Sequence, residues 1–165
     1  MKKTFKVMLV VMAAMILLAS CGGAKGAKEK DFSKAGMTIT LTEDFTEKEV
    51  VSQTVTYASM DEVVMALKEE FTLFEQINMD PQTTTLEQYF DLIKTNNKAQ
   101  WELKEEDGLK CFTYDNTGNG KDYSYLGVIL KGNDAFWLFQ FSCEKANFDS
   151  KKADFMKYAK SIKFD

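Results

Sequence analysis

Hydrophobic and polar residues alternate along several stretches of this chain, and the alternation predicts β-strands. In residues 37–41, apolar side chains alternate with threonine, which places the apolar ones on one face of a strand. Residues 54–58 and 63–67 are two further strand-like runs, and the serine and aspartate between them suit a turn. We therefore expect a β-hairpin here, although the composition of residues 63–71 also permits a helix.

Two other segments have the spacing of amphipathic helices. Thr84 and Thr85 begin two overlapping capping boxes, because each has a Glu or Gln three residues later. The helix that they open should end near residue 96, and residues 149–161 predict a second helix. The apolar residues on the two helix faces are Leu86, Tyr89, Phe90 and Ile93 in the first and Phe148, Phe155, Ala159 and Ile162 in the second.

The segment from Trp101 onward predicts a meander of antiparallel strands. The expected strands are 101–104, 110–114, 123–130 and 136–143, with turns at 105–108, 119–120 and 132–134. If Asn119 and Gly120 form a two-residue hairpin turn, Cys111 lies opposite Val128.

The side chains of this meander divide between two apolar faces. We expect one face to hold Leu126, Val128, Leu130, Phe136 and Leu138, and the other to hold Phe112, Tyr114, Tyr125, Ile129, Trp137, Phe139 and Phe141. Because both faces are apolar, both should be covered, and the two predicted helices are available as covers. The predicted fold class is α+β: an α/β/α sandwich whose mostly antiparallel sheet of about six to seven strands carries helices on both faces.

The N-terminus has the features of an export signal. Three lysines precede an apolar run over residues 7–18, which is shorter than the roughly 20 residues of a membrane-spanning helix. The sequence Leu18-Ala19-Ser20-Cys21 resembles a bacterial lipobox, which is cleaved just before a lipid-modified cysteine. We therefore predict a signal peptide over residues 1–20, lipidation of Cys21, and a location at the cell membrane, lipid-anchored and facing the extracytoplasmic side. The alternatives are an ordinary cleaved signal and an uncleaved anchor.

The rest of the chain divides into a tether and one domain. Residues 22–30 contain no apolar side chain larger than alanine, which predicts a flexible tether over residues 21–31. Order should begin near Phe32 or Gly36, and residues 32–165 are enough for a single domain with one core. The mature chain would carry 18 lysines and 25 acidic residues, a formal charge of −7. Nucleic acid is therefore not an expected partner, because phosphate binding needs a basic face.

The chain contains no histidine, and all its basic residues are lysines. Without histidine there is no Ser-His-Asp or Cys-His nucleophilic site, no imidazole base and no histidine metal ligand. Without arginine there is no planar group for bidentate recognition of carboxylate or phosphate. We therefore predict no catalytic residues, no metal site, no cofactor and no enzymatic activity.

Residues 115–120, Asp-Asn-Thr-Gly-Asn-Gly, look like the start of an EF-hand calcium loop. Position 12 of that loop would be Leu126 instead of glutamate, and the flanking residues predict strands instead of helices. We predict a hairpin turn here.

Two cysteines remain after Cys21. In the predicted meander, Cys111 and Cys143 lie on the first and third of three strands, about 9.6 Å apart, and a disulfide needs Cα atoms within about 7 Å. We expect two separate, mostly buried thiols, and a different strand order would reverse this expectation.

Exposed aromatic side chains are the remaining candidates for a ligand site. Trp137, Phe139 and Phe141 lie in a central strand, so we assign them to the core. Tyr123 and Tyr125, near the start of a strand, are the possible residues of a ligand groove for sugar or peptide.

Acidic residues occur in three clusters, 43–44, 69–70 and 105–107. Paired carboxylates hydrolyse glycans when they are held at a fixed separation, but nothing in the sequence brings two of these clusters together.

The order of the expected elements resembles that of the PsbP-like family: strand, hairpin, helix, meander, helix. The closing pattern Phe155-x-x-Tyr158-Ala159-x-Ser161-Ile162-x-Phe164 and the opening strand at residues 36–41 carry the resemblance, which covers residues 32–164. The segment 42–44 departs from it, because a Pro-x-Gly turn is expected there. The resemblance implies an antiparallel sheet between helices and a non-enzymatic binding or assembly role, and it supplies no functional residue.

Our leading hypothesis is a membrane-anchored extracytoplasmic lipoprotein that acts as a non-enzymatic binding or accessory module in the cell envelope. Its expected partners are membrane lipid, through acylated Cys21, and another envelope protein or a small ligand. The alternative is a carboxylate-dependent extracellular glycan hydrolase.

Overall fold

The computed structural model describes residues 28–165 of the chain. The predicted signal peptide, the predicted lipidation site Cys21 and most of the predicted tether lie outside the described residues. The strands are β1 (Glu29–Lys34), β2 (Met37–Thr42), β3 (Thr46–Glu47), β4 (Val55–Ala58), β5 (Glu62–Glu70), β6 (Lys104–Glu106), β7 (Leu109–Gly118), β8 (Lys121–Lys131), β9 (Ala135–Glu144) and β10 (Lys163–Phe164). The helices are α1 (Phe71–Gln76), α2 (Leu86–Asn96) and α3 (Phe148–Lys160), and a 3-10 turn over Lys145–Asn147 precedes α3.

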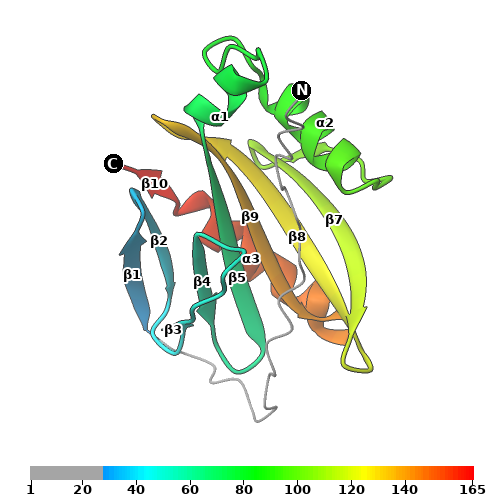
Figure 1. The fold of residues 1–165 in the computed structure, drawn as a ribbon. Helices are drawn as coiled ribbons and strands as arrows, with labels where there is room; N and C mark the ends of the chain where they lie inside the picture. Colours follow the sequence, from blue (N-terminus) through cyan, green and yellow to red (C-terminus); the bar gives the residue numbers. More distant parts are fainter. Residues whose placement is uncertain (1–27) are drawn as a thin grey trace.

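Seven strands form one antiparallel sheet in the order β3-β4-β5-β9-β8-β7-β6 (Figure 1). The β4–β5 hairpin predicted from residues 54–67 is present. Its second strand, β5, pairs with β9, so the hairpin extends the sheet formed by the meander β6–β9. Strand β5 ends at Glu70 and α1 begins at Phe71, which shows that the ambiguous segment 63–71 is almost entirely strand.

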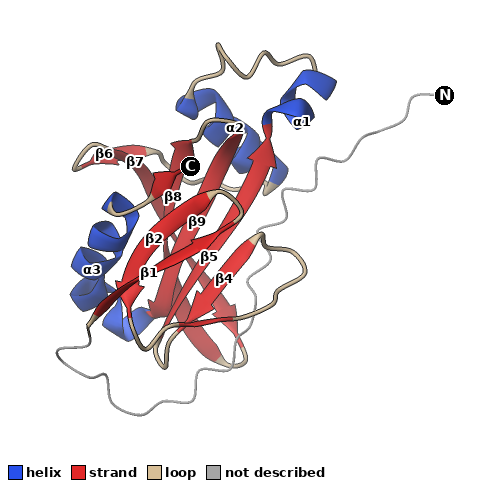
Figure 2. Cartoon of the chain, turned by 90° about the vertical axis from the view of Figure 1, so that its left-hand side faces the viewer, coloured by secondary structure: helices blue, strands red, loops and turns tan. Residues whose placement is uncertain are grey.

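Helices cover both faces of this sheet. Figure 2 shows α3 on one side and α1 and α2 on the other, and both α1 and α2 lie at the same end of the strands. The predicted α+β sandwich, with a mostly antiparallel seven-stranded sheet between helices, is therefore confirmed. We call the two sides of the sheet the α3 face and the α2 face.

A second, three-stranded sheet has the order β1-β2-β10 and was not predicted. Its middle strand, β2, buries Met37, Ile39 and Leu41 in the same core cluster as α3 and the α3 face of the main sheet. The C-terminal strand pairs with the other edge of β2, where Phe164 lies opposite Met37. The small sheet thereby holds the two ends of the described chain together.

The β7–β8 hairpin has the predicted register. Cys111 lies opposite Val128, and the turn residues Asn119 and Gly120 have φ angles of 52° and 75°. Positive φ at both central residues is the geometry of a type I′ turn, which an Asn-Gly pair adopts at low cost and whose twist matches that of the strands. The predicted hairpin turn is confirmed.

The predicted division of side chains between the faces is wrong for β9. Leu126 lies opposite Phe141 and Val128 opposite Phe139, so these four side chains share the α3 face. Trp137 is also in the α3-face core, whereas the α2 face receives Phe136 and Leu138 with Phe112 and Ile129. Lys131 lies opposite Phe136, and the Gly132 N–H donates to the Ala135 carbonyl at 2.9 Å, so the turn proper has two residues, Asn133 and Asp134, instead of the three expected. One residue fewer in the turn moves every β9 side chain to the other face.

Local signals placed the helices well. Of the two predicted capping boxes, the one at Thr85 forms: its hydroxyl accepts from the Gln88 N–H at 3.3 Å, and the Gln88 side chain accepts from the Thr85 N–H at 2.9 Å. Thr84 instead donates to the carbonyl of Asp80 at 2.7 Å. Helix α2 ends at Asn96, as expected.

Some element boundaries differ from the predictions, and one helix was missed. Strand β1 begins at Glu29, so residues 29–31 belong to the fold and the tether ends earlier than predicted. They join the fold through backbone pairing with β2 and not through buried side chains. The strand expected over 101–104 begins at Lys104, and α1 was not predicted.

Candidate functional site

The predicted groove residues Tyr123 and Tyr125 lie on β8 and point to the α2 face. They belong to the first part of β8, and α1 and α2 lie at the opposite end of the strands (Figure 1). Tyr125 lies opposite Tyr114 of β7, and the two rings stack with centroids 4.6 Å apart and planes 7° apart. On its other side, the Tyr114 ring stacks against Trp101 at 4.6 Å. Three aromatic rings therefore stand in one row across the edge of the sheet.

Aliphatic side chains continue this row across the remaining strands. Ala58, Val63, Ser142, Tyr125 and Tyr114 lie opposite one another on β4, β5, β9, β8 and β7. We call this part of the α2 face the tyrosine half. It consists of Thr56, Ala58, Val63, Met65, Tyr114, Tyr123, Tyr125, Gln140 and Ser142.

The apolar cluster of the tyrosine half contains only strand residues, and no helix within residues 28–165 contributes a side chain to it. At the other end of the same face, α1 and α2 supply Phe74, Tyr89, Phe90 and Ile93 to the cluster that covers the strands. The two ends of the α2 face are therefore built differently.

The tyrosine half also carries buried polar side chains. The Tyr114 hydroxyl donates to Gln140 Oε1, and Gln140 and Ser142 follow each other along β9 on this face. The Thr56 Oγ1 atom is buried and has no hydrogen-bond partner among the described residues. Thr56 is 1% exposed and Tyr125 is 4% exposed.

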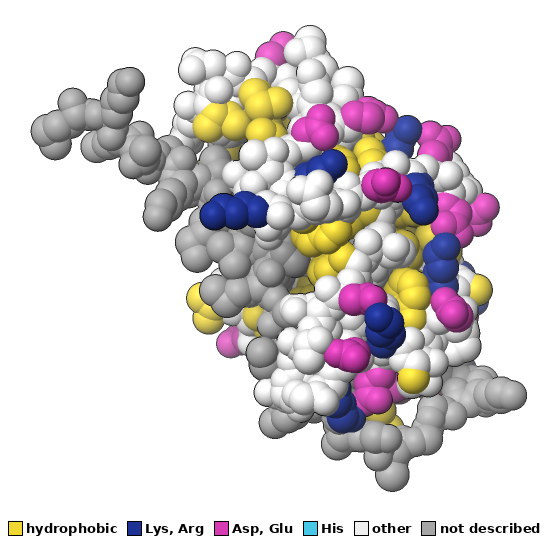
Figure 3. Space-filling model, turned by 90° about the vertical axis from the view of Figure 1, so that its right-hand side faces the viewer, with side chains coloured by type: hydrophobic (Ala, Val, Ile, Leu, Met, Phe, Trp, Pro, Cys, Tyr) yellow, Lys and Arg dark blue, Asp and Glu magenta, His cyan; other side chains and the backbone are white. Residues whose placement is uncertain are grey.

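The edge of the sheet beside the tyrosine half carries apolar side chains next to charged ones. Figure 3 shows this side of the molecule, with hydrophobic side chains near its middle and lysines and acidic residues around them. Trp101 and Leu103 are among the partly buried apolar residues that precede the edge strand β6.

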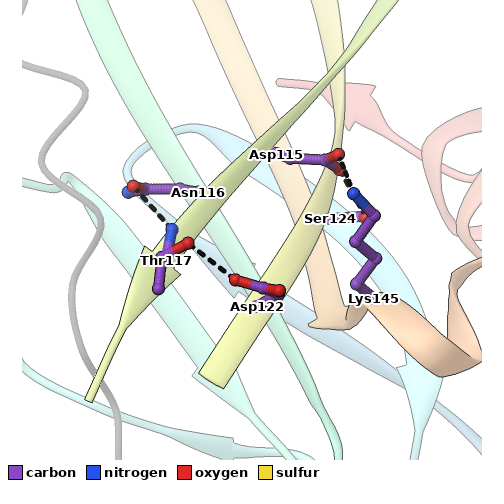
Figure 4. Close-up of polar contacts among 6 residues, drawn as sticks. All are labelled: Asp115, Asn116, Thr117, Asp122, Ser124 and Lys145. Atoms are coloured by element: carbon purple, nitrogen blue, oxygen red, sulfur yellow. Dashed lines mark hydrogen bonds and ion pairs between the residues drawn. The ribbon is translucent and has the colours of Figure 1, made fainter. Parts of the chain in front are cut away.

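The tip of the β7–β8 hairpin is a network of ordinary polar contacts (Figure 4). Asp115 accepts hydrogen bonds from Ser124 and Lys145, both at 2.6 Å, and these lower the pKa of its carboxyl group. Thr117 donates its hydroxyl to Asp122 at 2.6 Å. Within residues 28–165, no group of three or more His, Cys, Asp or Glu side chains is arranged to hold a metal ion.

The acidic clusters considered for hydrolysis lie in different environments. Glu69 is buried whereas its neighbour Glu70 is exposed. Residues 105–107 are each paired with a lysine, at 2.9 Å to Lys110, 2.7 Å to Lys152 and 2.6 Å to Lys160. The last two pairs span a shallow groove of about 570 Å³ between α3 and the β6–β7 turn. The two carboxylates that the β6–β7 turn contributes to this groove, Glu106 and Asp107, are both engaged in ion pairs.

Two glutamates of β5 are buried on opposite faces. Glu62 lies on the α3 face and receives Lys151 of α3, which also contacts Asp61 at 3.1 Å. Burial raises the pKa of Glu62, and the hydrogen bond from Lys151 offsets part of this rise. On the α2 face, Glu69 accepts a hydrogen bond of 2.6 Å from the buried Tyr89 hydroxyl, and burial raises the pKa of Glu69 to about 7.

The cysteines are apart, as predicted. Strand β8 lies between their strands, and Cys143 lies opposite Ser124, four residues along β8 from the partner of Cys111. Both thiols are free and buried. Burial raises the pKa of Cys143 to about 12, with the nearby Glu62 carboxylate adding to the effect, so this thiol is unreactive at neutral pH.

Comparison with known proteins identifies the fold. No family model and no curated protein matches the sequence. The structure is similar to the solution structure of cyanobacterial PsbP (CyanoP) from Synechocystis sp. PCC 6803, with a TM-score of 0.57 and 19% identity over 90% of this chain and 99% of that chain. It is also similar to a crystal structure from Bacteroides thetaiotaomicron VPI-5482, with a TM-score of 0.50 and 12% identity over 84% of this chain but only 48% of that chain. The chain therefore has a PsbP-like fold.

Within the described residues, no helix is both long and apolar enough to cross a membrane.

Proposed function

We propose that this chain is a membrane-tethered, non-enzymatic binding or accessory module of the cell envelope, and that it binds its partner through the tyrosine half. The observation that carries the proposal is the α2 face, where helices cover one end of the strands and the aromatic cluster at the other end is made of strand residues alone. Within residues 28–165 no helix contributes to this aromatic cluster, and a cluster of tyrosine side chains is typical of an interaction site.

The tether rests on the sequence Leu18-Ala19-Ser20-Cys21. Two or three acyl chains on Cys21 would hold the chain at the membrane for long periods, whereas one chain alone binds only marginally. The PsbP-like fold is compatible with an accessory role, and the lysine pairing of residues 105–107 favours binding over carboxylate-dependent hydrolysis.

Membrane attachment is tested by Cys21→Ser in the full chain. We expect the unmodified chain to be found in the membrane fraction and to incorporate labelled palmitate. The variant should remain unprocessed or be released from the membrane, and it should carry no label. A normally processed variant that stays in the membrane would contradict lipidation.

Binding is tested by recovering cross-linked partners from the native membrane with two matched variants. Tyr123→Lys places a positive charge on the tyrosine half. Thr113→Lys is the control: Thr113 is exposed and lies opposite Leu126, so it places the same charge on the α3 face. We expect the first variant to lose the partner that the unmodified chain and the second variant retain. Equal recovery by all three chains, or glycan turnover that a single carboxylate substitution abolishes, would contradict the proposal.

A further inference from the structure

One continuous segment, residues 71–97, covers the end of the α2 face that carries Glu69, and we call it the helical cover. It contains α1, α2 and the loop between them, and buried side chains such as Phe74, Tyr89 and Ile93 join it to the core cluster of this face. It follows directly on β5 and contains no strand. The cover can therefore move away from the seven-stranded sheet without breaking a hydrogen bond between strands.

Two lysines of the sheet make polar contacts with the cover that are open to water. The exposed Lys131 of β8 donates to the carbonyl groups of Gln82 and Thr84, at 3.1 and 3.3 Å. Lys110 of β7 forms an ion pair of 3.0 Å with Glu87, whose side chain is 56% exposed. Solvent-exposed ion pairs contribute little to stability, so these contacts do not hold the cover strongly.

The buried polar contact is the hydrogen bond that the Tyr89 hydroxyl donates to the Glu69 carboxyl group at 2.6 Å. Glu69 is 4% exposed and Tyr89 is 0% exposed. A protonated carboxyl group accepts this bond and remains uncharged. A carboxylate in the same place is a buried charge, which is costly unless a cation pairs with it. The charge state of Glu69 therefore changes the stability of the closed cover.

Among the described strands, none places such a cation beside Glu69. Glu69 lies opposite Phe136 of β9, and Lys131 of β8 lies on the far side of Phe136 in the same row. The Lys131 ammonium group lies over the Phe136 ring, 5.3 Å from its centroid, and bonds to the two carbonyl groups named above. Strand β4 does not reach this row, because its pairing with β5 ends at Val55 and Ala66.

Within residues 71–97, the helices supply no such cation either. The charged residue of α1, Glu75, is exposed. On α2, Glu87 forms the ion pair already described, Asp91 is exposed, and Lys94 lies in the last turn. Burial therefore raises the pKa of Glu69 to about 7, and the hydrogen bond that it accepts offsets only part of this rise.

We propose that the helical cover is a pH-dependent lid: loss of the Glu69 proton opens residues 71–97 as one unit and exposes the apolar strand surface beneath, while the sheet and α3 stay folded. This surface consists of Phe112, Ile129, Phe136 and Leu138. Helix α3 does not respond in the same way, because the buried carboxylate on its face, Glu62, pairs with Lys151. Neither the tether nor a bound partner is needed for this movement.

Amide hydrogen exchange measures how readily each region opens. The sample is the processed chain in lipid nanodiscs, and each exchange rate is divided by that of an unfolded peptide at the same pH. Opening places the Glu69 carboxyl group in water, where its pKa falls from about 7 to roughly 4.3. The opening constant of α2 should therefore rise roughly 75-fold from pH 5 to pH 8. It should exceed the opening constants of β8 and β9 at both pH values, because the sheet stays folded.

Three substitutions separate the Glu69 carboxyl group from other causes. Glu69→Gln should remove the pH dependence of the opening constant, and Glu70→Gln, at an exposed neighbouring position, should keep it. Tyr89→Phe removes the hydrogen bond but leaves the buried carboxyl group. In that variant the opening constant of α2 should be higher at both pH values and should still rise with pH.

A pH-independent opening constant in the unmodified chain would overturn the lid without the use of any variant. Equal opening constants for α2 and β9 would show that the cover is released only when the sheet unfolds. Equal pH dependence in Glu69→Gln and Glu70→Gln would assign the titration to another group. Either of these results would also overturn the lid. Recovery of a partner through Tyr123 does not depend on any of these outcomes, so the proposed function is tested separately.

Discussion

Glu62 and Glu69 lie seven residues apart on β5, each is only 4% exposed, and the two are held in opposite ways. Glu62, on the α3 face, is paired with a lysine of the helix that covers it. Glu69, on the α2 face, is bonded to a neutral tyrosine of the helix that covers it. An ion pair between Lys151 and Glu62 therefore links α3 to the sheet. A hydrogen bond from Tyr89 to Glu69, whose pKa is about 7, links α2 to it. Burial raises the pKa of both carboxyl groups, and the hydrogen bond from Lys151 offsets part of this rise at Glu62, whereas Glu69 has no cation beside it.

Lys151→Met removes the ion pair between α3 and Glu62 and should lower the free energy of unfolding more than any of the variants that follow. It would leave the Glu62 carboxylate buried without a partner, which costs about 3–5 kcal/mol in comparable ion pairs. The neighbouring Lys152→Met removes only a partly exposed pair with Glu106, a loss of less than about 1 kcal/mol. Urea unfolding of both variants gives the two values.

Adding Glu62→Gln to Lys151→Met should recover most of the lost free energy of unfolding, because the buried charge is then gone. Equal effects of Lys151→Met and Lys152→Met would show that Glu62 is not held by Lys151.

Glu69→Gln tests how the buried carboxyl group on the α2 face makes the stability of the chain depend on pH. Because the pKa of Glu69 is about 7 in the folded chain and near 4.3 in an unfolded one, the folded chain binds more protons between these values. Its stability should therefore fall as pH rises from about 4.5 to about 7, by roughly 3 kcal/mol. Glu69→Gln should remove this component, and the exposed neighbour substitution Glu70→Gln should keep it. Urea unfolding at pH 5 and pH 8 measures the difference, and identical pH profiles for both variants would contradict the assignment.

Gly127→Ala tests the packing between the two ends of the α2 face. A Cβ atom at this position would meet the Phe112 ring at 2.4 Å, and overpacking of this kind costs about 1–3 kcal/mol. Phe112→Leu in the same chain should recover part of the loss if the ring is the cause. A double variant no more stable than Gly127→Ala would assign the cost to the backbone instead.

Thr85→Ala is the smallest perturbation, because it removes only the capping box of α2. Loss of such a cap costs about 1 kcal/mol. Thr83→Ala, two residues earlier and exposed, should change the free energy of unfolding by less than about 0.5 kcal/mol. Thermal unfolding of the two variants side by side measures the contribution of the cap.

The sequence predicted those features that local chemistry decides. Asn119-Gly120 favours one turn type and so predicts the register of β7 against β8. The run Gly132-Asn133-Asp134 suits a three-residue turn as well as a two-residue one, and the faces of β9 were predicted wrongly for that reason. Strand β1 has one large apolar residue, Phe32, and is held by backbone pairing with β2, so its side chains gave little signal.

The candidate site divides in the same way. Alternation along β8 correctly placed Tyr125 on the same face as Tyr114, whereas the role of Tyr123 and Tyr125 as ligand residues remains a prediction. Glu69 looked like one member of an acidic pair. Its burial depends on Tyr89, twenty residues later, and on the helix that carries it, and no local pattern contains that information.

The pairing of β1 with β2 has a mechanical consequence for a chain anchored before residue 28. A pull at residue 28 away from the open end of the β1–β2 hairpin loads the Glu43–Lys28 backbone hydrogen bond first and the Glu29–Thr42 pair next, so the strand separates one pair at a time. Release of the six residues of β1 would lengthen the tether by about 20 Å before the load reaches the seven-stranded sheet. Force spectroscopy with one handle at residue 28 should record this as a separate extension at low force, ahead of the unfolding of the main sheet.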